Sequence, residues 1–175
     1  MRNTLFFLAG AALLLVQANL FRVLSYVPVA GATPSLVLPL ILFMGVHEYS
    51  LARGAAVAFM LGYATDVVGI APVGLYTFSF VAIFVLARAA GVRLAAQTMM
   101  TKVALAFVFA LLHAAMVLVL VAIFGRDAYV PRALYPMILP HAAATALVAP
   151  LVFRLAQRIH TSTVVAARPD LGSPS

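Results

Sequence analysis

Six mainly apolar runs determine what this chain can fold into. They cover residues 4–21, 35–46, 54–70, 73–87, 103–124 and 134–153, and only short connections lie between them. A membrane-spanning helix needs about 20 mainly apolar residues, with a lower limit near 17. The pattern therefore predicts an all-α polytopic membrane protein with six transmembrane helices. The second, third and fourth runs are near or below that limit, so these helices would thin the bilayer or partly re-enter it.

Composition excludes several classes of protein. Hydrophobic residues make up 66% of the chain and charged residues 9%, whereas a soluble domain carries about 25% charged residues. The chain has no cysteine, which removes disulfides, thiolate metal sites and cysteine nucleophiles. Its net charge of +7 comes from basic residues scattered singly between apolar runs. Such scatter makes no basic face, so we expect no nucleic-acid partner.

The basic residues predict the orientation in the membrane, because cytoplasmic loops are enriched in Lys and Arg. An inside N-terminus puts eight of them in the cytoplasm, namely Arg2, Arg53, Arg88, Arg93, Lys102, Arg154, Arg158 and Arg168. It leaves three outside, namely Arg22, Arg126 and Arg132. We therefore expect both termini to be cytoplasmic. Residues 1–160 would form one transmembrane domain whose basic loops contact lipid headgroups, and polar residues 161–175 a disordered tail.

Small and polar residues lie along one arc of the third apolar run. They are Gly54, Ala58, Gly62, Thr65, Asp66 and Gly69, spaced so that they share one side of a helix. Grooves of small residues allow close helix packing in lipid. Two interpretations remain open: the groove serves an internal helix contact, or it receives the helix of another protein.

Asp66 is the one acid well inside a predicted span, and burying a carboxylate in hydrocarbon is costly. Counted along their helices from the cytoplasmic side, Asp66, His113 and His141 lie at a similar depth. The three could form a buried polar cluster that holds three helices in register. Alternatively, Asp66 has a Ser, Thr or backbone partner unrelated to the histidines, or the group performs proton transfer or ligand binding in transport.

Catalytic and metal-binding patterns are missing from the sequence. Ser79 lies within a span, but nothing nominates a base beside it. The glycines form no phosphate-binding loop, and the histidines have no paired spacing typical of a metal site. We therefore predict a protein that is not an enzyme and has no cofactor and no metal.

The segment from Pro34 to Leu75 resembles a known family. A proline opens a short apolar span, and a set of residues follows at characteristic intervals, namely Gly54, Phe59, Gly62, Asp66, Gly69, Gly74, Leu75 and Tyr76. This pattern is similar to the central signature of the rod shape-determining protein MreD family. About 40 residues carry the resemblance, and elsewhere only hydropathy matches.

The resemblance implies a non-catalytic scaffold in the bacterial inner membrane. The family acts with the bitopic protein MreC, the actin-like MreB, a RodA-type glycosyltransferase and a class B penicillin-binding protein in lateral peptidoglycan synthesis. We expect MreC to be the helix that enters the groove, Gly62→Leu to fill that groove, and Asp66→Asn to retain most function.

The family fold looks similar to the six-helix substrate-binding subunits of energy-coupling-factor transporters, so a vitamin or metal transporter subunit is the alternative function. Those subunits typically dock through alanines four apart on the first helix. Here Ala9, Ala11 and Ala12 are followed at that interval by Leu13, Leu15 and Val16. This departure weakens the alternative.

Overall fold

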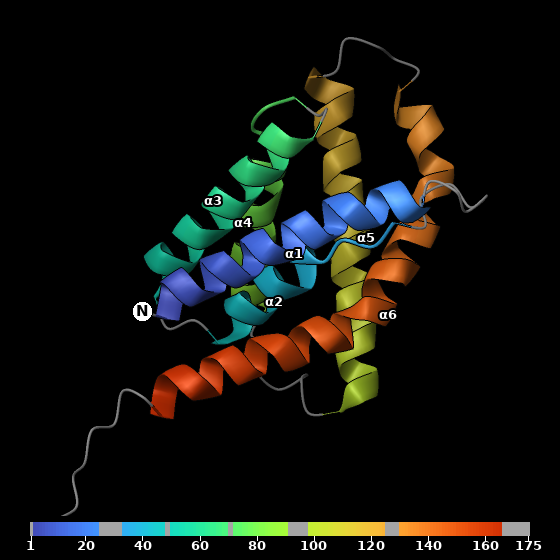
Figure 1. Ribbon diagram of the computed structural model, residues 1–175. Coiled ribbons are helices and arrows are strands. Elements are labelled where there is room, and N and C mark those ends of the chain that lie inside the picture. Colours follow the sequence, from blue (N-terminus) through green and yellow to red (C-terminus); the bar gives the residue numbers. More distant parts are fainter. Residues whose placement is uncertain are drawn as a thin grey trace, which may run out of the picture.

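The computed structural model describes residues 2–24, 33–47, 50–69, 72–90, 98–124 and 130–165. Within these residues the chain is all-helical, as predicted, and folds into one bundle (Figure 1). The six helices are α1 (Arg2–Leu24), α2 (Val37–His47), α3 (Leu51–Val68), α4 (Leu75–Ala89), α5 (Met99–Phe124) and α6 (Val130–Val165). Each of them overlaps one of the apolar runs of the sequence.

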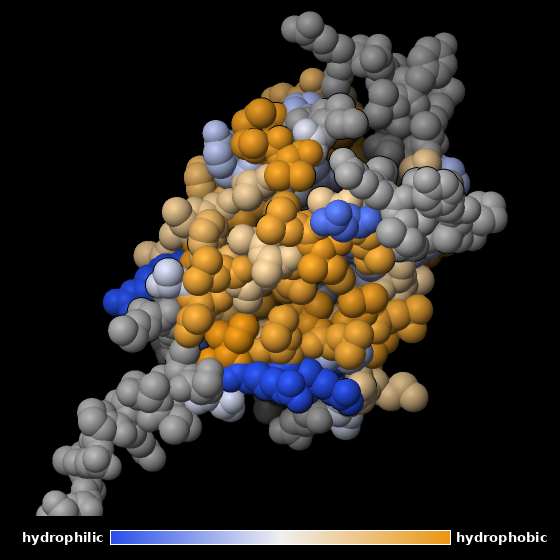
Figure 2. Space-filling view, viewed as in Figure 1, coloured by the Kyte–Doolittle hydropathy of each residue, from blue (hydrophilic) through white to orange (hydrophobic). Residues whose placement is uncertain are grey.

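Three helices are long and apolar enough to cross a membrane. They are α3, α5 and the part of α6 from Tyr135 to Thr161, and the apolar parts of α1, α2 and α4 are shorter. Apolar side chains also cover much of the face of the molecule seen in Figure 2, as a surface in contact with lipid requires. The chain is therefore a membrane protein, and the crossing of all six helices stays a prediction.

The short helix α2 forms the centre of the bundle. Its 11 residues span about 16 Å at 1.5 Å per residue, about half of a hydrocarbon core near 30 Å thick. Every residue from Val37 to Gly45 is buried, and the side chains of Leu40 and Ile41 have no exposed area. All five other helices contact α2. The second apolar run is thus a core helix that its neighbours shield from lipid.

Helices α3 and α4 form a hairpin with direct backbone contact. A Cβ atom added to Gly62 of α3 would lie 2.5 Å from Cα of Thr77 and 2.8 Å from the carbonyl oxygen of Tyr76, both on α4. These distances are shorter than any van der Waals contact. The absence of a side chain at position 62 therefore sets how closely the two helices approach.

Helix α6 is longer than its apolar run and contains Pro136, Pro140 and Pro150. A proline inside a helix removes one backbone hydrogen bond and favours a kink. In Figure 1, α6 first runs along α5 and then turns crosswise beneath α2. The helix continues to Val165, so residues 161–165 are helical where the sequence predicted a disordered tail. Residues 166–175 of that tail lie outside the described part of the chain.

We predict that Gly62→Ala destabilises the protein more than Gly10→Ala does. The new methyl at position 62 meets α4 backbone atoms, so α4 must shift, at a cost of about 1 to 3 kcal/mol. At position 10 the atoms within 3 Å are the side-chain methyls of Leu61 at 2.6 Å, which can rotate away. Thermal unfolding of both variants in detergent measures the difference, and equal midpoints would contradict this packing.

Candidate functional site

The most polar part of the bundle interior lies at the turn between α3 and α4. Helix α3 ends at Val68, and the next residue, Gly69, caps it by donating its N–H to the carbonyl oxygen of Thr65 at 2.9 Å. Helix α4 starts after Gly74, which has a φ of 102°, a left-handed conformation that glycine adopts without strain. Gly74 has no side chain to accept from the first N–H groups of α4. Those donors therefore need an acceptor from elsewhere.

Asp66 of α3 is that acceptor. Its Oδ2 accepts from the N–H of Gly74 at 2.9 Å, from the N–H of Thr77 at 3.0 Å and from the Thr77 hydroxyl at 2.6 Å. Its Oδ1 accepts from the N–H of Tyr76 at 2.8 Å. The side chain is only 2% exposed. A carboxylate on one helix thus caps the start of the next.

These hydrogen bonds explain how Asp66 can be buried although it has no basic partner in the described residues. The amino-terminal end of a helix carries a partial positive charge that favours an anion. Hydrogen bonds to an ionised acceptor contribute about 1.5 to 3 kcal/mol each, and water is not available in hydrocarbon to replace them. The geometry gives Asp66 a structural role, because both of its oxygens are occupied by donors of α4 and the turn before it.

His113 and His141 have other neighbours. The His113 ring on α5 is 4% exposed and packs against the rings of Tyr76 and Phe80, with centroid distances of 5.9 and 5.4 Å. Its Nε2 has no hydrogen-bond partner within the described residues. His141 on α6 bonds through Nδ1 to the carbonyl oxygen of Thr33 at 2.6 Å, so this nitrogen donates.

In the described part of the chain, no hydrogen bond joins Asp66 to His113 or His141, the two histidines of the expected polar cluster. Tyr76 contacts both residues, because its N–H bonds Asp66 and its ring stacks beside the His113 imidazole. Equal depth along three helices does not fix the side of each helix on which a residue lies. The partners of Asp66 are instead a threonine and backbone groups. This agrees with the alternative that Asp66 has a Ser, Thr or backbone partner unrelated to the histidines.

A second set of polar contacts surrounds the start of α2. The N–H of Leu36 donates to Gln17 Oε1 of α1 at 2.8 Å, and the N–H of Ser35 donates to Thr145 Oγ1 of α6 at 3.0 Å. The N–H of Leu38 donates to the Ser35 hydroxyl at 3.3 Å. Sequence reasoning missed Gln17, Ser35 and Thr145. Their signal was available, since each is a polar residue inside or at the edge of an apolar run.

The predicted groove on α3 is occupied by the chain itself at its centre. Gly54, Ala58, Gly62 and Asp66 are buried, whereas Gly69 is exposed. Thr65 is half-buried and its hydroxyl bonds the carbonyl oxygen of Leu61 in its own helix. Helix α4 packs on Gly62, and its N–H groups bond Asp66. These contacts agree with the interpretation of the groove as an internal helix contact, and its use by a partner helix stays a prediction.

The described residues offer little support for a catalytic, ligand-binding or metal site. The Ser79 hydroxyl, fully buried, donates to the carbonyl oxygen of Leu75. A cavity of about 20 Å³ lies between α2, α5 and α6, which is room for about one water molecule. No group of three His, Asp or Glu side chains in this part of the chain could hold a metal ion.

We predict that Asp66→Asn lowers stability measurably and that Asp66→Ala lowers it further. An asparagine can keep its oxygen at the Oδ2 position, but its amide then faces the N–H of Tyr76, and two donors meet. The loss of one charged hydrogen bond costs about 1.5 to 3 kcal/mol of folding stability. Alanine loses all four contacts.

Thermal unfolding in detergent ranks these variants, with Thr65→Ala as the control. That control removes a hydroxyl that bonds only within α3. The structural role of the acid would be wrong if Asp66→Asn unfolded at the wild-type temperature.

Comparison with known proteins agrees with the resemblance seen in the sequence. A family model described as rod shape-determining protein MreD matches residues 1–159. No curated protein and no solved structure gave a match. The matched range contains α1 to α5 and most of α6, together with both capped helix starts. The chain belongs to the MreD family of rod shape-determining proteins.

Proposed function

We propose that this protein is a non-catalytic scaffold of the rod complex in the bacterial inner membrane. Membership of the MreD family gives it a role in determining rod shape. The proposal adds that it has six membrane crossings with both termini in the cytoplasm. It further adds that the protein binds MreC and links MreB to a RodA-type glycosyltransferase and a class B penicillin-binding protein.

The observation that supports a scaffold most strongly is how the bundle uses its buried polar groups. The Asp66 carboxylate accepts four hydrogen bonds at the start of α4. Gln17 and Thr145 accept from the start of α2. Side chains occupied in this way fix helices in place and are not available as a base or a ligand. The outer helix surfaces are then what the protein offers to partners.

The alternative function, a substrate-binding subunit for a vitamin or metal, has less support. The cavity between α2, α5 and α6 has a volume of about 20 Å³, far below the 300 Å³ or more typical of small-molecule sites. A wider and open hollow of about 380 Å³ has four lining residues among those that the structure describes, namely Leu15, Val16, Asn19 and Leu20 of α1. These side chains give an open surface that does not enclose a solute.

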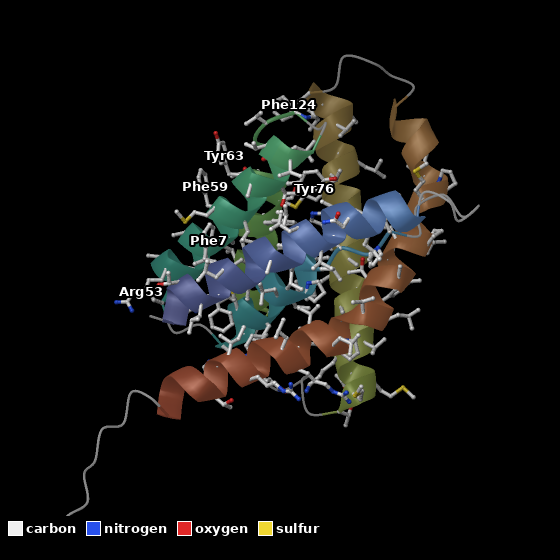
Figure 3. All side chains as sticks on the ribbon, in the orientation of Figure 1. Phe7, Arg53, Phe59, Tyr63, Tyr76 and Phe124 are labelled. Carbon is white, nitrogen blue, oxygen red and sulfur yellow. The ribbon has the colours of Figure 1, made fainter. Side chains whose placement is uncertain are left out.

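For MreC we propose the outer face of α3 in place of the inner groove. Phe59, Tyr63 and Val67 follow one another at intervals of four residues, and each is more than half exposed. The rings of Phe59 and Tyr63 point away from the bundle (Figure 3). Aromatic side chains are enriched at the centres of protein interfaces. The opposite face of α3 is fixed against α4, so this stripe is presented rigidly to a single transmembrane helix such as that of MreC.

We predict that Phe59→Ala/Tyr63→Ala reduces co-purification of MreC about tenfold or more and causes loss of rod shape. Truncation of central aromatic contacts typically costs more than 1 kcal/mol each. The matched control is Phe78→Ala/Val85→Ala, which removes exposed apolar area from α4 and should leave MreC binding unchanged.

Three outcomes would contradict parts of this proposal. Failure of the unaltered protein to co-purify with MreC would overturn the scaffold role. Equal loss in both double variants would overturn the α3 contact. A saturable rise in the unfolding temperature with a vitamin or metal ion would favour the transporter alternative, because ligand binding stabilises the folded state.

A further inference from the structure

The C-terminal part of α6, residues 151–165, lies across the base of the bundle, and we call it the α6 arm. Figure 1 shows it running crosswise beneath α2. Phe43 of α2 contacts Phe153 and His160 of the arm, with ring centroids 6.4 and 6.3 Å apart. His47 at the end of α2 also lies edge-on to His160, at 5.7 Å. These contacts hold the arm against the core helix.

The side chains of the arm divide into three strips. Val152, Phe153 and Ala156 are buried against the bundle. On the outer side Leu151 and Leu155 are 63% and 41% exposed, one turn apart. Arg154 and Arg158, also one turn apart, are exposed beside them. A helix with leucines on one outer edge and arginines on another is typical of one that lies at a membrane surface.

Further cationic and polar groups gather where the arm meets the base of α5. An Nη2 atom of Arg154 lies 3.8 Å from Sδ of Met99 in the first turn of α5. One turn further along α5, Lys102 lines the 20 Å³ cavity together with His47 and Gln157. In Figure 2 a blue band lies on the lower border of the orange face. The band marks the boundary between apolar and polar surface.

Among the described residues, no carboxylate is available to pair with these cations. Asp66 is the single acidic residue in the part of the chain that the structure describes, and its oxygens accept from α4 and the turn before it. Glu48 follows His47 in the sequence but lies outside the described residues. Positive side chains beside exposed leucines fit a ligand that is both anionic and apolar.

We infer that Lys102, Arg154 and Arg158 bind the phosphodiester headgroup of an anionic phospholipid. The glycerol and the upper acyl chain lie along Leu151 and Leu155. A free phosphate would use the cations but not the adjoining leucines, so the leucine edge selects the lipid. The site is on α5 and α6 and does not depend on the proposed MreC contact on α3.

The test compares phosphatidylglycerol with phosphatidylcholine of the same acyl chains, added to the full chain in a neutral detergent. Native mass spectrometry and thermal unfolding report binding. We expect phosphatidylglycerol to be retained and to raise the unfolding temperature, whereas phosphatidylcholine and inorganic phosphate do not. Because each cation near an anionic lipid contributes about a fivefold factor in affinity, Lys102→Gln/Arg154→Gln should weaken binding about 25-fold.

The matched control is Arg53→Gln, which removes one exposed charge from the start of α3, away from the α6 arm (Figure 3). It should bind phosphatidylglycerol as the unaltered chain does. Lys102→Arg/Arg154→Lys keeps both charges and should keep most of the binding. This variant distinguishes a loss of charge from a loss of folding as the cause of weaker binding in the double Gln variant. If the double Gln variant does not fold, the comparison of the two lipids on the unaltered chain still decides.

Several results would overturn the inference. Equal retention of phosphatidylglycerol and phosphatidylcholine would show that the cations do not select an anionic lipid and only set the orientation of the chain in the membrane. An effect of inorganic phosphate as large as that of the lipid would make the site a simple anion site. Unchanged binding in the double Gln variant, or an equal loss in Arg53→Gln, would place the lipid elsewhere.

Discussion

The structure depends on one constraint, that helices which begin inside an apolar bundle must have their first N–H groups satisfied by protein. Water cannot reach these donors in a membrane interior, and each unpaired donor costs several kcal/mol. Both short helices meet this constraint with side chains of other elements. Asp66 of α3 caps α4, and Gln17 of α1 with Thr145 of α6 caps the segment before α2.

The cap on α4 also explains why the signature residues occur together. Gly62 and Asp66 lie one turn apart on the same face of α3, so the glycine allows the close approach that the carboxylate needs. Gly69 ends α3, and Gly74 adopts the left-handed conformation that starts α4. The N–H of Tyr76 then faces the acid. The pattern that resembles the family is thus one structural unit, a helix turn with its cap.

Sequence reasoning predicted the helices because apolar length and uncharged composition are local properties. It also identified Asp66 as the buried acid, because a charge in an apolar run is visible in one dimension. It could not assign the partners of Asp66, since depth along a helix does not give the direction in which a side chain points. The burial of α2 and the crosswise end of α6 depend on packing between distant segments. Gln17 and Thr145 were missed because a polar residue in an apolar run has several possible partners.

Amide hydrogen exchange in the full chain, compared between the unaltered protein and Asp66→Ala, tests whether the Asp66 carboxylate holds the first turn of α4. We expect slow exchange at Gly74, Tyr76 and Thr77 in the unaltered protein. In the variant their exchange should be at least about tenfold faster, because a lost charged hydrogen bond costs about 1.5 kcal/mol or more. Residues 35–38 at the start of α2 should not change. Unchanged exchange at the start of α4 would show that Asp66 does not hold this turn.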